Sequence, residues 1–227
     1  MVTRRPTRIV LVDDHVLVRS GMRALLDAQP DLEVTGEASD GAAGVELALN
    51  SHPDVVLMDL AMPVLDGIEA TKRIVAAGSR ARILVVTSHD DDSLVLRALR
   101  AGATGFFLKD AAADRLAEAV RAVANGDTLL APPIARRLVE SQLGGTRMTL
   151  RPRFTSLTER EREIVRRLAH GLSNAALAHD LGLSEATVKT HVTRLLTKLG
   201  VRSRVQAVVL AYESGFVRPG HTGDAEI

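Results

Sequence analysis

The first half of the chain alternates between two patterns of apolar residues that predict different secondary structure. Four short runs are continuous and rich in β-branched residues, as in strands buried on both faces of a sheet, and they cover residues 8–12, 54–58, 82–86 and 104–108. The stretches between them carry apolar residues at helical spacing. Strands that alternate with helices form parallel sheets whose carboxyl ends share one edge, where open α/β sheets bind ligands. We therefore expect an α/β domain with its functional site at that edge.

A polar side chain suited to phosphate chemistry stands at the end of each of these four runs. Two acidic residues, Asp13 and Asp14, follow the first run, and Asp59 follows the second. Thr87 follows the third run and Lys109 the fourth. Each also has an ordinary interpretation, because an acid between a strand and a helix often caps the helix, and a threonine or lysine often lies at the surface. Their occurrence at all four strand ends favours one shared site.

Together these groups could hold a magnesium ion and accept a phosphoryl group. Mg²⁺ prefers oxygen ligands, and the carboxylates of Asp13, Asp14 and Asp59 would repel one another without a cation. Asp59 could then attack a phosphoryl group in line, while Mg²⁺ and Lys109 neutralise charge on its oxygens and the Thr87 hydroxyl donates a hydrogen bond to one of them. The dianionic product would pull on Thr87 and Lys109, and this pull would act as a switch.

Five strands and five helices are expected in the first part of the chain, and only helices after residue 157. The strands are expected at about 8–12, 33–38, 54–58, 82–87 and 104–108, and the helices at about 15–28, 41–50, 66–77, 90–100 and 112–125. The later helices are expected at about 158–170, 173–181, 184–199 and 203–213. The chain thus divides into an α/β part and an all-α part.

The segment between the two parts has the composition of a linker. Pro132-Pro133 can open a short helix to about Gln142, and Gly144-Gly145 with Arg151-Pro152-Arg153 indicates a flexible stretch. The expected organisation is a first domain over residues 1–126, a linker that can contain the short helix over 127–154, a second domain over 155–218 and a disordered tail over 219–227.

Charge differs between the two parts. Residues 1–125 contain 14 Lys and Arg against 18 Asp and Glu, whereas residues 151–218 contain 12 against 6. A basic second part suggests a nucleic-acid partner, although chance scatter of surface charge would give the same imbalance. The chain has no Cys, no signal-peptide core and no apolar run near the roughly 20 residues that span a bilayer. We therefore expect a soluble cytoplasmic protein without thiolate chemistry or membrane partners.

Residues 8–125 resemble the receiver domain of two-component response regulators. The resemblance is carried by Val12-Asp13-Asp14-His15, by residues 58–67 (MDLAMPVLDG), by Val86-Thr87-Ser88 and by residues 102–109 (GATGFFLK). It implies a flavodoxin-like (βα)5 fold with a five-stranded parallel sheet. It also implies that a sensor histidine kinase is the phosphodonor and that Mg²⁺ is the cofactor.

The same resemblance assigns roles to individual residues. Asp59 would be the phosphoacceptor, Asp13 and Asp14 would serve the metal, and Thr87 and Lys109 would be the switch pair. The main-chain carbonyl of Ala61 would complete the metal shell. Phe106 stands where the family keeps a switching aromatic residue, and the alternative is a plain core residue in an apolar strand. Ala61 offers no polar side chain to place a hydrolytic water.

Residues 173–199 have the pattern of two helices joined by a tight turn. The first helix ends before Gly182, and Ser184 is suited to cap the second. On the second helix Val and Leu residues fall on one face, whereas the other face is cationic or hydroxylic and carries Lys189, Thr190, Thr193, Arg194, Thr197 and Lys198. Such a helix fits the major groove of DNA, although any solvated amphipathic helix can have this pattern.

The surrounding sequence resembles the four-helix LuxR-type DNA-binding domain over about 60 residues. The resemblance is carried by residues 157–165 (LTEREREIV), 171–174 (GLSN), 187–192 (TVKTHV) and 198–207 (KLGVRSRVQA). It implies a recognition helix over 184–199. In that helix Lys189, Thr190 and Thr193 would face bases, and Arg194 and Lys198 would lie near phosphates. With the receiver, it identifies the chain as a member of the NarL/FixJ class of response regulators.

The last helix would supply the contact between two subunits in this family. The residues concerned are Val205, Val208, Val209 and Tyr212. The alternative is that they only cover the domain core, and both roles can hold together. A homodimer, at least when phosphorylated, would place two recognition helices in the major groove of a two-fold symmetric double-stranded site.

The expected function is phosphorylation-controlled regulation of transcription, with a kinase transferring phosphate to Asp59. The receiver would catalyse only its own phosphoryl transfer and dephosphorylation, so the chain is not expected to be an enzyme. One alternative keeps the DNA-binding function and makes the receiver a phosphate-independent dimerisation scaffold. A hydrolase that uses Asp59 as nucleophile is a further alternative, but short loops and the absence of a catalytic cluster in the second part disfavour it.

Overall fold

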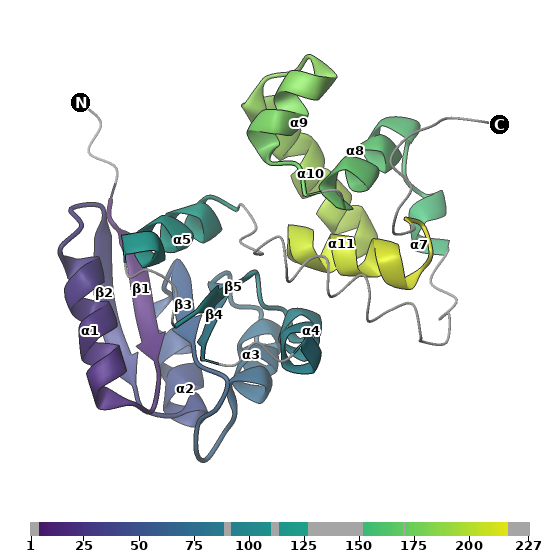
Figure 1. Cartoon of the computed structure of the whole chain (residues 1–227). Coiled ribbons are helices and arrows are strands. Elements are labelled where there is room, and N and C mark those ends of the chain that lie inside the picture. Colours follow the sequence, from purple (N-terminus) through teal and green to yellow (C-terminus); the bar gives the residue numbers. More distant parts are fainter. Residues whose placement is uncertain (1–4, 89–91, 110–113, 127–151, 170, 218–227) are drawn as a thin grey trace. The chain divides into compact units, whose positions relative to one another are not determined.

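The computed structural model describes residues 5–88, 92–109, 114–126, 152–169 and 171–217 (Figure 1). Contacts divide the chain into two units, residues 1–131 and 132–227. The helix expected from Pro132-Pro133, most of the expected linker and the expected tail over 219–227 lie outside the described residues. Within the described residues, no helix combines the length and apolar character needed to cross a bilayer.

The first unit is a parallel five-stranded sheet with helices on both faces (Figure 1). Its strands are β1 (Thr7–Val12), β2 (Leu32–Ala38), β3 (Val55–Met58), β4 (Arg82–Thr87) and β5 (Gly105–Leu108), in the order β2-β1-β3-β4-β5. Its helices are α1 (Val16–Asp27), α2 (Gly41–Ser51), α3 (Gly67–Ala76), α4 (Asp92–Ala101) and α5 (Asp114–Asn125). This is the flavodoxin-like architecture that the sequence predicted.

The two faces of the sheet form separate cores because alternate side chains of a strand point to opposite faces. Ile9 and Leu11 of β1 pack with residues of α1 and α5. Val10 and Val12 pack on the other face, with residues of α2 and α3 such as Ile74. The side chains of β1 and β3 are buried on both faces of the sheet, which explains why these strands are continuous apolar runs in the sequence rather than alternating ones.

The second unit is entirely helical among its described residues. Its helices are α7 (Pro152–Thr155), α8 (Glu159–Ala169), α9 (Asn174–Leu181), α10 (Glu185–Leu199) and α11 (Arg204–Glu213). The last four agree with the four predicted helices to within one residue at each end. Their core contains Ile164, Leu177, Val188 and Leu195.

Helix α7 was not predicted, and it changes the expected boundary of the second unit. Phe154, which the sequence assigned to the linker, is 3% exposed and belongs to the core of this unit. Its ring stacks on Phe216 with centroids 4.4 Å apart. A four-residue helix is too short to show helical periodicity in the sequence. Its packing against Phe216 could not be predicted either, because that residue is far away along the chain.

Candidate functional site

The sheet brings the four predicted polar strand ends to one edge. β1, β3, β4 and β5 are neighbours in the sheet and run parallel, so the residues that follow them lie side by side. Main-chain hydrogen bonds join these ends in pairs. The N–H of Asp59 donates to the carbonyl of Val12 at 2.9 Å, and the N–H of Lys109 donates to the carbonyl of Thr87 at 2.9 Å.

A buried ion-pair network joins three of the predicted residues. The Lys109 ammonium nitrogen lies 2.7 Å from Asp13 Oδ2 and 3.0 Å from Asp59 Oδ2. Asp13 is fully buried and Asp59 is 4% exposed. Two buried carboxylates this close destabilise each other, and one ammonium offsets only one of their two charges. The site is therefore short of positive charge.

Burial and charge act on the pKa values of this network in opposite directions. Burial raises the pKa of Asp59 above its ordinary value, and the hydrogen bond from Lys109 only partly opposes the rise. Burial by itself would lower the pKa of Lys109, but hydrogen bonds to Asp13 and Asp59 outweigh it and raise that pKa. Lys109 therefore stays cationic at neutral pH, next to a carboxylate that burial disfavours in its ionised form.

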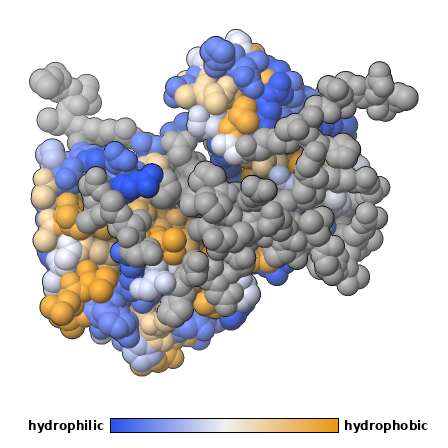
Figure 2. All heavy atoms as spheres, in the orientation of Figure 1, coloured by the Kyte–Doolittle hydropathy of each residue, from blue (hydrophilic) through white to orange (hydrophobic). Residues whose placement is uncertain are grey.

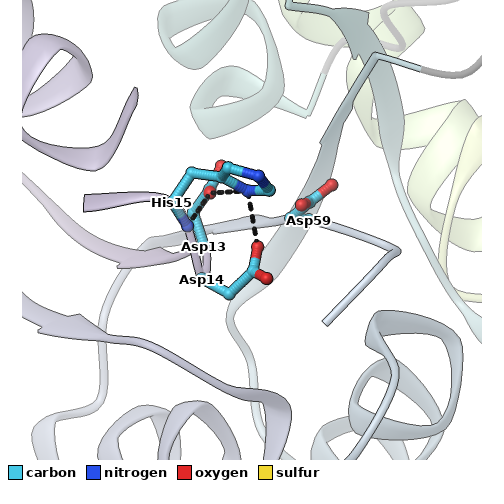
Figure 3. Close-up of side chains that lie close together, drawn as sticks. All are labelled: Asp13, Asp14, His15 and Asp59. Atoms are coloured by element: carbon cyan, nitrogen blue, oxygen red, sulfur yellow. Dashed lines mark hydrogen bonds and ion pairs between the residues drawn. The ribbon is translucent and has the colours of Figure 1, made fainter. Parts of the chain in front are cut away.

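Asp13 and Asp14 do not cap helix α1, so the capping interpretation is wrong. The N-cap residue of α1 is His15, whose side chain makes no capping hydrogen bond. Asp13 Oδ1 instead accepts from the His15 main-chain N–H at 2.9 Å, and Asp14 Oδ1 lies 2.7 Å from His15 Nδ1 (Figure 3). The sequence reasoning gave His15 no role, and its place directly after the two acids was the available signal.

The carboxylates form a cluster whose chemistry suits a hard cation. Atoms of Asp13, Asp14, His15 and Asp59 that can bind a metal all lie within 4.8 Å of one another (Figure 3). Asp13 Oδ2 and Asp14 Oδ1 are buried; the first contacts the Lys109 ammonium nitrogen at 2.7 Å and the second contacts His15 Nδ1 at 2.7 Å. Several carboxylate oxygens and an excess of negative charge fit Mg²⁺.

The loop between β3 and α3 is held tightly against Asp59. The main-chain N–H of Gly67 donates to the carbonyl of Leu60 at 3.0 Å, and a Cβ atom on Gly67 would lie only 1.8 Å from the carbonyl oxygen of Asp59. Asp66 caps α3 by accepting from the N–H of Glu69. Ala61 lies exposed in this loop, two residues after Asp59. A glycine at position 67 is therefore a requirement of the site's geometry.

Thr87 and Phe106 are both buried, but only Thr87 lies at the edge of the sheet that carries the site. Thr87, at the end of β4, has no exposed surface. Phe106 is 2% exposed, on β5 next to Val85 of β4. The structure thus places Thr87 at the predicted edge and Phe106 inside the sheet layer. The switching role of either residue stays a prediction.

A second candidate site lies on α9 and α10, which form a helix-turn-helix. Ser173 caps α9, Gly182 ends it in the left-handed conformation with φ of 63°, and Ser184 caps α10 by accepting from the N–H of Thr187. Val188 and Leu195 of α10 are fully buried. The opposite face is exposed and carries the predicted contact residues Lys189, Thr190, Thr193, Arg194 and Lys198.

Comparison with known proteins assigns each of the two units to a known domain family. Residues 9–121 match the response regulator receiver domain, and residues 155–211 match the bacterial regulatory proteins of the luxR family. The transcriptional regulatory protein LiaR of Bacillus subtilis (strain 168) is 44% identical over 210 residues, which are 92% of this chain and 99% of LiaR. The chain belongs to the NarL/FixJ family of response regulators.

Other members of the family match over nearly the whole chain. The nitrate/nitrite response regulator protein NarL of Escherichia coli (strain K12) is 38% identical over 215 residues, which are 94% of this chain and 98% of NarL. The crystal structure of the response regulator ChrA, from a heme-sensing two-component system, is 37% identical and covers 94% of this chain with a TM-score of 0.52. The predictions of family, fold and regulatory function are confirmed: this response regulator is a phosphorylation-controlled, DNA-binding transcriptional regulator.

One predicted DNA contact of this response regulator has an internal partner. The ammonium group of Lys198 lies 2.7 Å from Glu161 Oε1, and Glu161 Oε2 also accepts from the main-chain N–H of Thr158 at 2.8 Å. Burial raises the pKa of Glu161, but these hydrogen bonds outweigh it and hold that pKa below its ordinary value. The ammonium group of Lys198 is therefore paired with the Glu161 carboxylate of α8, and it is less available to a phosphate than the charged group of Lys189 or Arg194.

The residues predicted for dimerisation differ in exposure. Val205 has no exposed surface, so it cannot contact a second subunit in this conformation, which corrects that part of the prediction. Val208, Val209 and Tyr212 are partly exposed. Val208 and Tyr212 also pack against the core, and the Tyr212 hydroxyl donates to the carbonyl of Ala169 at 3.0 Å. The surface left for a partner is the outer side of these three residues.

Proposed function

We propose that Asp59 of this response regulator accepts a phosphoryl group from a sensor histidine kinase, and that phosphorylation controls how a homodimer binds a two-fold symmetric DNA site. The observation that carries the proposal is the position of the Lys109 ammonium group, which lies against both Asp13 and Asp59. Such a cation is placed where negative charge would increase during phosphoryl transfer.

The acidic cluster is the proposed magnesium site. Asp13, Asp14 and Asp59, with the main-chain carbonyl of Ala61, would hold the ion. When bound, Mg²⁺ supplies charge neutralisation on the phosphoryl oxygens. The buried carboxylates of Asp13 and Asp59, which share a single ammonium group, support this assignment, since a cation would compensate the remaining negative charge.

The proposed reaction uses the chain's own groups in defined roles. An oxygen of the Asp59 carboxylate bonds to phosphorus as the P–N bond of the kinase's phosphohistidine breaks, and the released imidazole takes up a proton. Lys109 neutralises the equatorial oxygens, and the Thr87 hydroxyl donates to one of them. Lys109 then exchanges its contact with Asp59 for one with the phosphoryl group. Movement of Thr87 and Phe106 towards the new group would carry the signal to the receiver surface.

An exposed apolar surface beside the site is the proposed contact for the kinase. Val16 and Leu17, in the first turn of α1, are 61% and 88% exposed, and Val64 in the loop after β3 is 86% exposed. Figure 2 shows hydrophobic residues gathered on the side of the first unit where α1 lies. Exposed large apolar side chains next to a reacting group are typical of a protein contact.

The second unit is the proposed DNA reader. Lys189, Thr190 and Thr193 of α10 would face base edges, and Arg194 would contact backbone phosphates, with Lys198 contributing partially. Val208, Val209 and Tyr212 of α11 would form the subunit contact. The proposed place of action is the cytoplasm, because the proposed partner is bacterial DNA.

The proposed domain boundaries are those expected from the sequence, with the second unit beginning earlier. The receiver takes residues 1–126 and the DNA-binding unit takes 155–218, to which α7 and Phe154 are added on the basis of their packing. The only proposed catalysis is the receiver's own phosphoryl transfer and dephosphorylation.

A small phosphodonor tests the receiver chemistry without a kinase. The full chain is incubated with acetyl phosphate and Mg²⁺, and its intact mass is measured. One added phosphoryl group is expected, which is absent from Asp59→Asn and strongly reduced when EDTA replaces Mg²⁺. An unmodified wild-type chain, or equal modification of Asp59→Asn, would contradict the proposal and would favour the phosphate-independent scaffold.

A further inference from the structure

All four threonines of the recognition helix have hydroxyl groups that are already hydrogen-bonded, three of them to main-chain carbonyls of the helix and one to its N-cap residue. The bonds are Thr190 Oγ1 to the carbonyl of Ala186 at 3.0 Å, Thr193 Oγ1 to that of Lys189 at 2.9 Å, Thr197 Oγ1 to that of Thr193 at 3.1 Å, and Thr187 Oγ1 to Ser184 Oγ at 2.8 Å. In the first three bonds the hydroxyl donates its single proton to the helix backbone. Such a side chain offers a partner only a methyl group and oxygen lone pairs.

Three of these threonines form a stripe at the centre of the exposed face. Thr190, Thr193 and Thr197 are spaced by three and four residues, which places them on one side of a helix with 3.6 residues per turn. All three are exposed, and the fully buried Val188 and Leu195 lie on the opposite side. The middle of the surface that α10 presents to a groove is therefore a line of methyl groups, and the exposed Lys189 and Arg194 lie beside it.

The chemistry of this stripe limits which bases it can read. In the major groove only thymine carries a methyl group, and apolar contact with that methyl group is one of the standard readout modes. Bidentate readout of adenine needs Asn or Gln, and α10 contains neither. A threonine whose proton is committed to the backbone cannot donate to a purine N7 or to thymine O4.

We propose that Thr190 and Thr193 recognise thymine methyl groups by apolar contact, so that each operator half-site has thymines facing these two residues. The first turns of a recognition helix are the part that reaches base edges, which favours Thr190 and Thr193 over Thr197. This inference rests on the proposed DNA-binding function, and it adds the chemical feature of the DNA that the helix reads.

The test begins with a selected DNA site. Full-length protein treated with acetyl phosphate and Mg²⁺ enriches duplexes from a random-sequence pool, and the enriched duplex serves as the probe. Each thymine of a half-site is then replaced by uracil, which removes only the methyl group. Uracil is expected to weaken binding about fourfold at one or two positions of each half-site, the effect of one buried methyl group, and to have no effect elsewhere.

Two substitutions distinguish the contribution of the threonine methyl group to binding from that of the hydroxyl group. Thr193→Ser removes the methyl group and keeps the hydroxyl, so it is expected to bind thymine and uracil equally at its position. Thr193→Val keeps the methyl group and removes the hydroxyl, so it is expected to retain the fourfold preference for thymine. The same pair of changes at Thr190 is expected to act at a different thymine. Circular dichroism verifies that each variant remains folded.

The outcomes distinguish this inference from the function on which it rests. The methyl readout alone would be overturned if the enriched duplex tolerated uracil at every position. It would also be overturned if Thr193→Val lost the thymine preference and Thr193→Ser kept it. Failure to enrich any duplex would overturn the proposed DNA-binding function and, with it, this inference.

Discussion

The ammonium nitrogen of Lys109 lies 3.0 Å from Asp59 Oδ2, although the two residues are fifty positions apart in the sequence and come from different strands. This contact follows directly from the sheet order, in which only β4 separates β3 from β5. It places a fixed cation against the one carboxylate that the proposed chemistry modifies. The remaining excess of buried negative charge is the basis for proposing a cation at this site.

Mg²⁺ is expected to stabilise the receiver through this acidic cluster. A ligand that binds only the folded state at a hundredfold excess over its Kd adds about 2.7 kcal/mol to the free energy of unfolding. Thermal unfolding of the full chain, with MgCl₂ or EDTA, measures this effect on the receiver transition. Asp13→Asn is expected to lose most of the stabilisation. Equal Mg²⁺ stabilisation of wild type and Asp13→Asn would place the ion elsewhere.

Leu17→Asp is expected to slow phosphorylation by the kinase but not by acetyl phosphate. Leu17 is 88% exposed, so in the proposed complex it would contribute apolar area to the kinase contact, and a charge there would cost a desolvation penalty only in that complex. The rate of phosphotransfer from the cognate phosphorylated kinase is expected to fall at least tenfold. Leu25→Asp, farther along α1, is the matched control. Equal slowing with both donors would show instead that the substitution damages the acidic site.

Gly67→Ala is expected to destabilise the receiver and to abolish phosphorylation of Asp59. Its new methyl group would lie 1.8 Å from the carbonyl oxygen of Asp59, and relieving this overlap requires movement of the main chain at the acceptor. We expect a loss of about 3 kcal/mol in the free energy of unfolding, measured by urea denaturation.

Gly21→Ala is the control for this substitution, because a Cβ there meets no atom within 4 Å. Position 21 is an exposed site within α1, where alanine is expected to stabilise the helix by about 0.5–1 kcal/mol. A Gly67→Ala protein as stable and as readily phosphorylated as Gly21→Ala would contradict the described geometry of the loop.

The Glu161–Lys198 ion pair is expected to make the stability of the DNA-binding unit depend on pH. The folded-state pKa of Glu161 lies below the ordinary value of 4.5. The ionised carboxylate therefore stabilises the folded unit above about pH 4.5, and this stabilisation is lost as the pH falls through the folded-state pKa. The free energy of unfolding of Glu161→Gln is expected to be about 1–2 kcal/mol lower than that of wild type at pH 7. The loss is limited to this size because Lys198 is partly exposed to solvent.

Urea titrations at pH 7 and below pH 4 measure this difference, which is expected to shrink at the lower pH because wild type then loses the same contribution. Glu185→Gln, at an exposed position at the start of α10, is the control and is expected to change stability by less than about 0.5 kcal/mol. A difference between wild type and Glu161→Gln that stays constant with pH would contradict the role of the ionised pair.

The sequence allowed the strands, the sheet edge and the residues at that edge to be predicted because each depends on a local pattern and a general topological rule. Parallel strands with short crossovers leave little freedom in where Asp13, Asp59 and Lys109 meet. Pairings between helices could not be predicted in this way. The contact of Glu161 with Lys198 depends on how α8 crosses α10, and the stacking of Phe154 on Phe216 depends on a helix of one turn. Neither distance is encoded in the spacing of residues along the chain.

The central claim, that phosphorylation of Asp59 controls binding to DNA, is tested most directly by one titration. The selected duplex is titrated with wild type and with Asp59→Asn, each with and without acetyl phosphate and Mg²⁺, and the fraction bound is measured by fluorescence anisotropy. Wild type is expected to bind at least tenfold more tightly after treatment, and Asp59→Asn is expected to show no change. Equal affinity of the two proteins after treatment would contradict the account.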